Sequence, residues 1–483
     1  ELAKGRVKSS SEGAEGDVRA SEEGRLKTLF RLTALSAALL GFSEGAWATI
    51  PEGSVTGGAV LAIGTGSTVA NGTGAMSIGH NAQAKTNGAL AIAPNSTHTT
   101  ISNGNNSIAI GVNLRADGSK AIGIGADTNV TGISAIAIGN NDSGRMANQG
   151  VNGNGAIGVG SNLTVRGNNA IAVGTESQAK ANDTVAVGTG AQATLTNSIA
   201  IGKNSVATGV NNLAKDPANV GNAVAIGPGV QALGEDSVAI GVSAGANLTT
   251  ASTKQSLAIG WTAKATGLAQ AVAIGPDAIA SGAQSTSIGN NTRAIGDSSI
   301  AIGGDDWNVV RTKKVAEAGN KQVHQVFEEL TGMPMKQQGE AYKNPFKGTT
   351  AGDAAVAIGV AALAEGALST AFGSGTSASG VGAAAFGVGA TASQNKSVAI
   401  GAGSHTNTNA TRETTATVNG ITYSGFAGAE HITAGSQVSF GSAGYERQLK
   451  HVAPGAITAT STDAINGSQL YALHVGAGNI AKS

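Results

Sequence analysis

The side chains that could perform acid–base or metal chemistry lie far apart along this chain. Its 7 histidines are dispersed, as His80, His98, His324, His405, His431, His451 and His474. They form neither an HxH pair nor the HExxH motif of zinc enzymes, and no P-loop occurs. Cys is absent, which excludes disulfides and thiolate sites. The sequence therefore predicts a protein that is not an enzyme and that has no catalytic residue, cofactor or metal.

Two short patterns resemble binding motifs. The string Gly155-Ala156-Ile157-Gly158-Val159-Gly160 imitates a dinucleotide fingerprint, but similar strings recur too often and no helix is expected after them. Gly304-Asp305-Asp306 could ligate a cation through oxygen, and a turn or helix-capping role is the favoured alternative. The GGxGxD nonapeptide of calcium-binding rolls does not recur, so bound calcium is not implied.

Composition indicates how such a chain could be built. Among 483 residues there are 73 Gly, 8 Pro and only 3% aromatic residues, and Ala, Val and Ile supply most of the apolar content. A core of such small side chains must be thin and regular. The 30 basic residues balance the 30 acidic ones, so the charge footprint of a nucleic-acid-binding protein is absent.

A repeat dominates the sequence from Gly57 to Ser404. Its pentads have the form Ser198-Ile199-Ala200-Ile201-Gly202. With the closing Gly as a marker (Ala93 fills one place), 14 residues separate the markers in twelve of nineteen intervals, for example 174, 188 and 202. An exact period with occasional additions is typical of a solenoid whose loops tolerate insertions.

The residues inside each unit predict two short strands and two turns. Val398, Ala399 and Ile400 alternate with a period of two, and Gly401 ends the strand where positive φ is needed. The second half of the unit, with its own strand, is a segment of the type Gly190-Ala191-Gln192-Ala193. Coils should pair in parallel and in register, about 4.8 Å apart. We expect Val, Ile and Ala inside the coil and an exposed, Ala-rich outer face on which copies of the chain associate.

The N-terminal residues predict export. Leu29 to Phe42 is a short apolar stretch with Lys27 at its start, and Ala46-Trp47-Ala48 resembles a cleavage site. A buried amphipathic helix is the alternative.

Residues 304–352 interrupt the repeat. They contain Trp307, Phe327, Tyr342 and Phe346, and KQVHQVFEEL has the spacing of a short amphipathic helix. This insertion could contact a ligand or lock a trimer, or it could be a tolerated decoration. His324 within it is expected to be packed or solvated, and not a ligand.

The repeated (N/D/K/S)-S-(V/I)-A-I-G motif resembles the YadA-like head of trimeric autotransporter adhesins. Glu1 to Ser10 looks like part of that class's extended signal peptide, and Gly303-Gly304-Asp305-Asp306 looks like the start of its head insertion motif. Val438 to Gln448, followed by Asp463 to Leu473, looks like its neck.

This resemblance implies an all-β fold: a left-handed parallel β-roll in a homotrimer, with a small helical insertion and a neck leading to a coiled coil. The expected divisions are 1–48 (extended signal peptide, a fragment), 49–303 (head repeats), 304–352 (insertion), 353–437 (second block of repeats and connector), 438–473 (neck) and 474–483 (start of the stalk). Gly476 and Gly478 weaken helix propensity in the expected stalk. The outer-membrane anchor is expected outside this chain.

The function implied by the resemblance is attachment at a Gram-negative cell surface. Its expected partners are further copies of the chain and host receptors or matrix proteins such as collagen, fibronectin or laminin, with no nucleic acid. Polar residues before each strand are candidate ligand contacts on the outer surface: Asn106, Ser107, Asn197, Ser198, Asp236, Ser237, Lys396 and Ser397. Alternatively, they serve only turns and stacking hydrogen bonds.

The candidate trimer contacts of the neck are Asp463, Asn466, Gln469, Leu470 and Leu473. A rigid spacer is the alternative function, whereas a lyase on a β-helix would need a cluster of acids and bases that the repeats lack.

Overall fold

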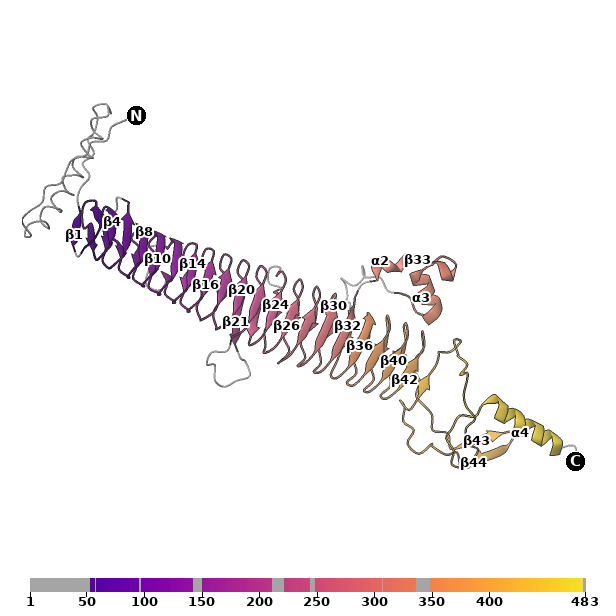
Figure 1. Ribbon diagram of the computed structural model, residues 1–483. Helices are drawn as coiled ribbons and strands as arrows, with labels where there is room; N and C mark the ends of the chain where they lie inside the picture. Colours follow the sequence, from indigo (N-terminus) through magenta and orange to yellow (C-terminus); the bar gives the residue numbers. More distant parts are fainter. Residues whose placement is uncertain are drawn as a thin grey trace, which may run out of the picture. The chain divides into compact units, whose positions relative to one another are not determined.

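A computed structural model describes residues 53–56, 58–94, 97–141, 150–210, 221–243, 248–305, 307–335 and 348–480. The predicted signal peptide, Asp306, Tyr342 and Phe346 lie outside them. Within them, the chain winds into coils that stack in chain order as a parallel β-solenoid (Figure 1). The predicted β-roll class is thereby confirmed, while its handedness and the trimer stay predictions.

One strand of each coil belongs to a ladder that we call sheet A, which runs from β2 to β45. Its strands are β2 (Leu61–Ile63), β4 (Met76–Gly79), β6 (Leu90–Ala93), β8 (Ile108–Val112), β10 (Ile122–Ala126), β12 (Ile136–Asn140), β14 (Ile157–Val159), β16 (Ile171–Val173), β18 (Val185–Val187), β20 (Ile199–Ile201), β22 (Val224–Ile226), β24 (Val238–Ile240), β26 (Leu257–Ile259), β28 (Val272–Ile274), β30 (Thr286–Gly289), β32 (Ile300–Gly304), β36 (Val356–Val360), β38 (Thr370–Phe372), β40 (Ala384–Phe386), β42 (Val398–Ile400) and β45 (Val438–Ser439).

The other strand of each coil belongs to sheet B, a 20-stranded ladder. Its strands are β1 (Ser54–Thr56), β3 (Val69–Asn71), β5 (Ala82–Ala84), β7 (Thr100–Ser102), β9 (Arg115–Ala116), β11 (Asn129–Val130), β13 (Gly150–Val151), β15 (Thr164–Val165), β17 (Gln178–Ala179), β19 (Gln192–Ala193), β21 (Val206–Val210), β23 (Gln231–Gly234), β25 (Thr250–Ala251), β27 (Lys264–Ala265), β29 (Ile279–Ala280), β31 (Arg293–Ala294), β35 (Thr350–Ala351), β37 (Leu363–Ala364), β39 (Ser377–Ala378) and β41 (Thr391–Ala392).

The repeat positions coincide with the strand register, as predicted. In β10 and β12, Ile122 pairs with Ile136 and Gly125 pairs with Gly139. The longer intervals leave the ladder intact, because β20 still pairs with β22 across residues 202–227. Insertions are therefore accommodated between strands and do not shift the register.

Each coil turns twice through the left-handed region. In the coil around Ile199, Asn197 has φ 58° and Asn204 has φ 56°, so the two turns lie seven residues apart. The marker glycines adopt a different conformation: Gly188 has φ 133°, which is accessible essentially to glycine alone. The 14-residue coil is thus two similar halves, each with one strand and one turn.

The core corrects the expected side-chain orientation. The Ala of each sheet A strand is buried, as in Ala186, Ala200 and Ala239, and the Ala of sheet B faces it, as in Ala193 and Ala207. The flanking Val and Ile point outward and stay partly exposed. The predicted interior of Val, Ile and Ala is therefore confirmed for Ala and wrong for most Val and Ile, and the predicted Ala-rich outer face is wrong. The two sheets leave room mainly for Ala, Ser and Thr between them.

Outside the coils, the insertion contains α2 (Asn308–Arg311), β33 (Lys314–Val315), η2 (Ala316–Ala318), β34 (Lys321–Gln322) and α3 (Val323–Thr331). The helix predicted from KQVHQVFEEL is thus present. After the last coil come a hairpin of β43 (Thr415–Val418) and β44 (Ile421–Ser424) and the helix α4 (Gly467–Ile480). Figure 1 shows α2 and α3 on the side of the stack and α4 at its C-terminal end.

Candidate functional site

The predicted ligand-contact ladder divides into two sets at the turns that lead into sheet A. Asn106, Asn197, Asp236 and Lys396 are exposed and occupy the left-handed position of the turn. The neighbouring residues Ser107, Ser198, Ser237 and Ser397 are completely buried. Ser237 Oγ donates to the Gly234 carbonyl oxygen at 2.6 Å, and Ser397 Oγ donates to that of Gln394 at 2.8 Å. The prediction that these serines lie on the outer surface is therefore wrong, because all four side chains point into the coil. The hydroxyls of Ser107, Ser237 and Ser397 bond the turn from within.

The exposed turn residues form hydrogen bonds between coils. Asn197 Nδ2 donates to Asn222 Oδ1 at 3.0 Å, and Asn222 Nδ2 donates to Asp236 Oδ1 at 2.9 Å. Asparagine is suited to this position because it tolerates the left-handed conformation and has both a donor and an acceptor. The ladder therefore contributes to stacking. Whether it also contacts a ligand stays a prediction.

The outer face of sheet A is apolar along the solenoid. Two outward positions flank the buried central residue of each strand, which is usually Ala, and in most coils Val, Ile or Leu occupies both. Examples are Ile122 and Ile124, Val224 and Ile226, and Val398 and Ile400. Ile124, Ile138, Ile201, Ile226 and Ile400 count among the exposed large apolar side chains. A continuous exposed apolar surface of this kind marks an interaction face.

The outer face of sheet B is predominantly polar. The outward residue is polar in most of its strands and apolar in a few, such as those of Ile101, Ile279 and Leu363. The polar ones include Arg115, Gln178, Gln192, Thr250, Lys264 and Arg293. The outward residues are therefore mostly apolar on sheet A and mostly polar on sheet B, whereas the inward residues of both sheets are small. The sheet A face can pack against another protein surface, and the sheet B face can remain in contact with water.

The insertion packs on four successive coils downstream of its own position. Trp307, Phe327 and Met335 form a small buried cluster that also contacts Val360 and Val388 of the coils. The Trp307 and Phe327 rings lie 5.7 Å apart at 60°. Of the predicted helical positions Phe327 is buried, whereas Leu330 is exposed. His324 Nδ1 lies 3.2 Å from the Arg311 carbonyl oxygen, which agrees with its predicted packed role.

Small residues of the coils make this contact possible. The second turn residue after the marker is Ala361, Gly375, Gly389 or Gly403 in these four coils, where other coils carry residues such as Asn204 or Asp277. A Cβ at Gly375 would lie 3.1 Å from Trp307 Cη2. At Gly389 it would lie 2.7 Å from Thr331 Cγ2, and at Gly403 2.6 Å from Thr331 Cα. Because Ala361, Gly375, Gly389 and Gly403 have little or no side chain, α3 can approach the backbone of these coils closely.

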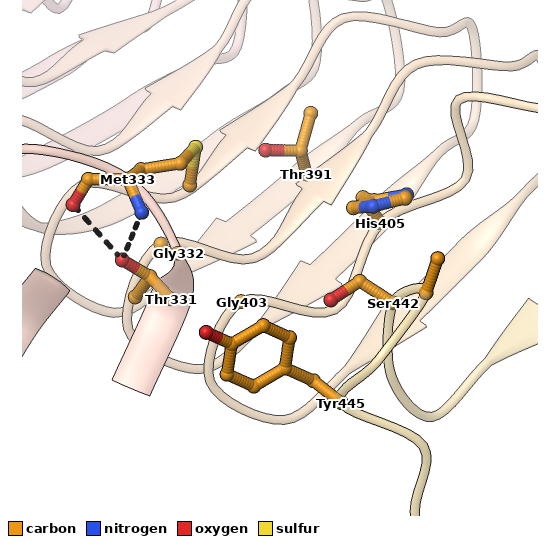
Figure 2. Close-up of a pocket in the computed structure, with 10 residues that line it drawn as sticks. Thr331, Gly332, Met333, Thr391, Gly403, His405, Ser442 and Tyr445 are labelled. Atoms are coloured by element: carbon orange, nitrogen blue, oxygen red, sulfur yellow. Dashed lines mark hydrogen bonds between the residues drawn. The ribbon is translucent and has the colours of Figure 1, made fainter. Parts of the chain in front are cut away.

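A cavity of about 240 Å³ opens where the insertion, the last coils and the start of the neck meet (Figure 2). Thr331 and Met333 of the insertion, Thr391 and His405 of the coils, and Ser442 and Tyr445 of the neck line it. In Figure 2 Thr331 turns toward the Met333 backbone, and its Oγ1 accepts a hydrogen bond from the Met333 N–H at 3.1 Å. His405 Nδ1 is buried without a hydrogen-bond partner among the described residues. The cavity offers hydroxyl and imidazole groups but no charged side chain.

Arg447 holds the start of the neck to the final coil. Its Nη1 donates to the Phe440 carbonyl oxygen and to Ser404 Oγ, at 2.6 and 2.9 Å, and its Nη2 donates to the Ala402 carbonyl oxygen at 2.6 Å. β45 also extends sheet A, since Val438 pairs with Val398. Beside it, the Gly444 N–H donates to the exposed Glu446 carboxylate and lowers the pKa of that group. The residues predicted as neck thus begin as a continuation of the solenoid.

The predicted trimer contacts of the neck also divide into two sets. Gln469 bonds both the N–H and the carbonyl of Gly455, Asn466 Nδ2 donates to the Val452 carbonyl oxygen at 3.1 Å, and Asp463 Oδ2 accepts from the Ala456 N–H at 3.0 Å. These three side chains hold the start of α4 against residues of the same chain. Leu470 and Leu473 are 64% and 71% exposed, so they remain the candidates for contact with another copy.

The described residues contain no group of three His, Cys, Asp or Glu side chains placed to hold a metal ion. Asp305 is largely buried, and its two carboxylate oxygens accept hydrogen bonds from the side-chain amides of Asn290 and Asn291, at 2.8 and 2.7 Å. These two bonds tie Asp305 to the turn of the preceding coil. The letters of residues 241–245 match GxSxG, but Ser243 Oγ donates to the Gly229 carbonyl oxygen in a solenoid turn. Among the helices described, none is long and apolar enough to cross a membrane.

Comparison with known proteins identifies the family of the repeats. A family model described as the YadA head domain repeat matches residues 70–92, 116–141, 166–191, 179–205, 193–211, 221–247, 251–278, 269–292, 280–305, 351–376 and 378–404. Among 9 matching chains of solved structures is the C-terminal YadA-like domain of a protein from Burkholderia pseudomallei, with 38% sequence identity and a TM-score of 0.20. The match covers 22% of this chain and 48% of that chain. No curated protein matches this chain.

Proposed function

Because this chain belongs to the family of YadA head domain repeats, we propose that it is the head of a trimeric autotransporter adhesin, which attaches a Gram-negative bacterium to host surfaces. The YadA head domain repeats point to an adhesin-type surface fibre. The observation that carries the proposal is the two-sided coil, with an apolar outer face on sheet A and polar residues on sheet B and the turns.

The apolar face supports the homotrimer. Outward Val and Ile side chains along sheet A would stay half in water in a single copy, and association removes them from water at about 25 cal/mol per Å². Three copies with their sheet A faces turned to a common axis would cover this surface and leave the turns and sheet B exposed. The same arrangement would cover Leu470 and Leu473 of α4, which find little cover within the chain.

The exposed turns support ligand attachment by avidity. Residues at the position of Asn106, Asn197, Asp236 and Lys396 recur once per coil, about 4.8 Å apart along the stack. A row of weak, equivalent contacts, repeated on each copy, raises the apparent affinity far above that of one contact. Matrix proteins of the collagen, fibronectin and laminin class are extended or multivalent, so they can engage many coils at once.

The test compares binding of the full chain to immobilised collagen, fibronectin and laminin with that of a ladder variant. Asn106, Asn197, Asp236 and Lys396 are replaced by Gly, which removes the side chains but keeps the left-handed turn. The control replaces Gln178, Gln192 and Gln231 on sheet B by Ser. We expect the ladder variant to lose at least tenfold in apparent affinity and the control to bind normally. Equal binding by both variants would contradict the ladder as the contact surface.

A second variant separates the adhesin from the spacer. Excising residues 304–346 joins Gly303 directly to Lys347. Two residues then separate the marker Gly303 from Thr349, which is the spacing between Gly202 and Ser205 in an uninterrupted coil. We expect matrix binding to persist, since the ladder remains. Lost binding would move the activity to the insertion. No matrix binding by the unmodified chain in any array would favour the spacer function.

A further inference from the structure

Two successive strands of sheet A, β38 and β40, have Phe on their outward face. We call the two outward residues of each strand the first and third positions, since they flank the buried Ala. In β38 they are Thr370 and Phe372, and in β40 they are Ala384 and Phe386. The layers on either side have Val and Ile, as in Val398 and Ile400 of β42. In both layers, therefore, a larger third residue accompanies a smaller first residue.

The interior of the same solenoid shows what such a pairing achieves. Leu114 fills the core of its coil, and the facing strand has Gly123 in place of the usual Ala. A Cβ at Gly123 would lie 2.6 Å from Leu114 Cδ2. At Gly158 it would likewise lie 2.6 Å from Val151 Cγ2 and 2.7 Å from Leu163 Cδ1. A large side chain is thus matched by a small one across a packed gap.

On the outer face the matching residue is not in the same chain. First and third positions of one strand stand side by side on sheet A, and Phe372 and Phe386 are 53% and 41% exposed. The two Phe residues are neighbours along the ladder, because β38 and β40 pair Phe372 with Phe386. Beside them stand Thr370 and Ala384, whose side chains are shorter than Phe, and we call this lower part of the face the depression. We call Phe372 and Phe386 the ridge. The ridge and the depression each extend over the same two strands, β38 and β40.

Symmetry decides how two such faces meet. If copies are related by an axis parallel to the stack, every layer meets the same layer of its neighbour. The third-position column of one copy then faces the first-position column of the next, because contacts around a three-fold axis are head-to-tail and join opposite edges of the same face. An axis perpendicular to the stack would bring unequal layers together and would leave the ridges without a depression.

We propose that the Phe372–Phe386 ridge of one copy inserts into the Thr370–Ala384 depression of the next, and that this interlock sets the register of the assembled heads. The inference rests on the homo-oligomer of the proposed function and adds to it the contact that prevents one copy from sliding along another. Uniform Val and Ile layers permit such sliding, since each coil of the face resembles the next. The two Phe layers distinguish one register from all others.

The test is a double-variant cycle on the full chain. Ala384→Val places a larger residue opposite Phe386, Phe386→Ile leaves a gap opposite Ala384, and the double variant recreates the Val and Ile pair of β42. We expect each single variant to lower the melting temperature of the oligomer by roughly 3 °C or more, and the double variant to recover most of that loss. Ser377→Val, an outward residue of sheet B in a neighbouring coil, is the control and should change little.

The outcomes distinguish the interlock from the oligomer. Additive effects of the two substitutions in a protein that light scattering shows to be an oligomer overturn the interlock and leave the proposed assembly standing. A monomeric mass at all concentrations overturns both. Because the chain contains no Cys, a second measurement is available. A chain with Ala384→Cys, produced together with a differently tagged chain with Phe386→Cys, should form a mixed disulfide on oxidation. If Ala384→Cys alone cross-links equally well, like positions face each other and the interlock is wrong.

Discussion

At the scale of residues, two kinds of glycine serve the coil in different ways. The marker Gly188 has φ 133°, and a Cβ there would lie 2.6 Å from the backbone carbonyl carbon and oxygen of Gly202 in the next coil. Gly190 has φ 68°, and the Cβ it lacks would meet only the end of the Asn204 side chain. Asn204 itself occupies the equivalent position in its coil with φ 56°. The first position requires glycine, whereas the second requires only a residue that tolerates the left-handed region.

This difference predicts opposite outcomes for two substitutions two residues apart. Gly188→Ala should destabilise the protein by roughly 3 kcal/mol, because it combines a strained backbone with a backbone collision. Gly190→Asn should leave stability nearly unchanged, because it recreates the turn of the following coil. Thermal unfolding followed by circular dichroism compares the two. Similar melting temperatures would show that the marker glycines are not required by sterics.

At the scale of elements, the insertion is a docked part of the head. Its helix α3 lies along Gly375, Gly389 and Gly403, and Trp307 and Phe327 are buried in the contact. The cavity at the end of α3 places Thr331 close to Tyr445 of the neck. The insertion thus contacts both the coils of Gly375, Gly389 and Gly403, which come later in the chain, and the start of the neck at Tyr445. The roles predicted from sequence, which are ligand contact, trimer locking or a tolerated decoration, stay predictions.

Phe327→Ala should therefore loosen the C-terminal coils specifically. Removing a buried Phe costs about 3 kcal/mol, and the loss falls on the coils that the insertion covers. Hydrogen exchange should accelerate in residues 356–405 and stay unchanged in coils such as 171–202. Val309→Ala is a matched control, since Val309 is on the same insertion but 76% exposed. Unchanged exchange in 356–405 would mean that the contact contributes no stability.

At the scale of the whole molecule, the described chain leaves much apolar surface without cover. Sheet A exposes a column of Val, Ile and Phe, and the residues after the last coil have Ala429 as their one buried apolar side chain among those described. The hairpin of β43 and β44 is exposed throughout. An isolated two-stranded hairpin is marginal in water, so this region needs further protein surface to be stable. Additional copies of the chain are the partner that the apolar face suits.

The exposed apolar face of α4 yields the corresponding prediction. Replacing Leu470 and Leu473 by Ser should weaken the oligomer, so that light scattering detects dissociation at concentrations where the unmodified chain stays associated. The solenoid contacts are unaffected, and the circular dichroism of the β-structure should be preserved. His474→Ser on the same helix is the control. Association that is equally tight in the Leu variant and the control would show that α4 is not part of the interface.

Much of the architecture was accessible from sequence because the repeat is local. The 14-residue period, the parallel register and the helix in residues 321–330 depend on alternation and spacing, which the chain displays directly. The alternation of Val185, Ala186 and Val187 defines two faces, but it does not say which face points inward. That depends on the gap between sheets A and B, which accommodates Ala and excludes most larger side chains. The same gap buries Ser107, Ser198, Ser237 and Ser397 and removes them from the predicted contact surface. The docking of α3 on distant coils and the hold of Arg447 on Ala402 likewise needed the tertiary structure, because they join residues that no period relates.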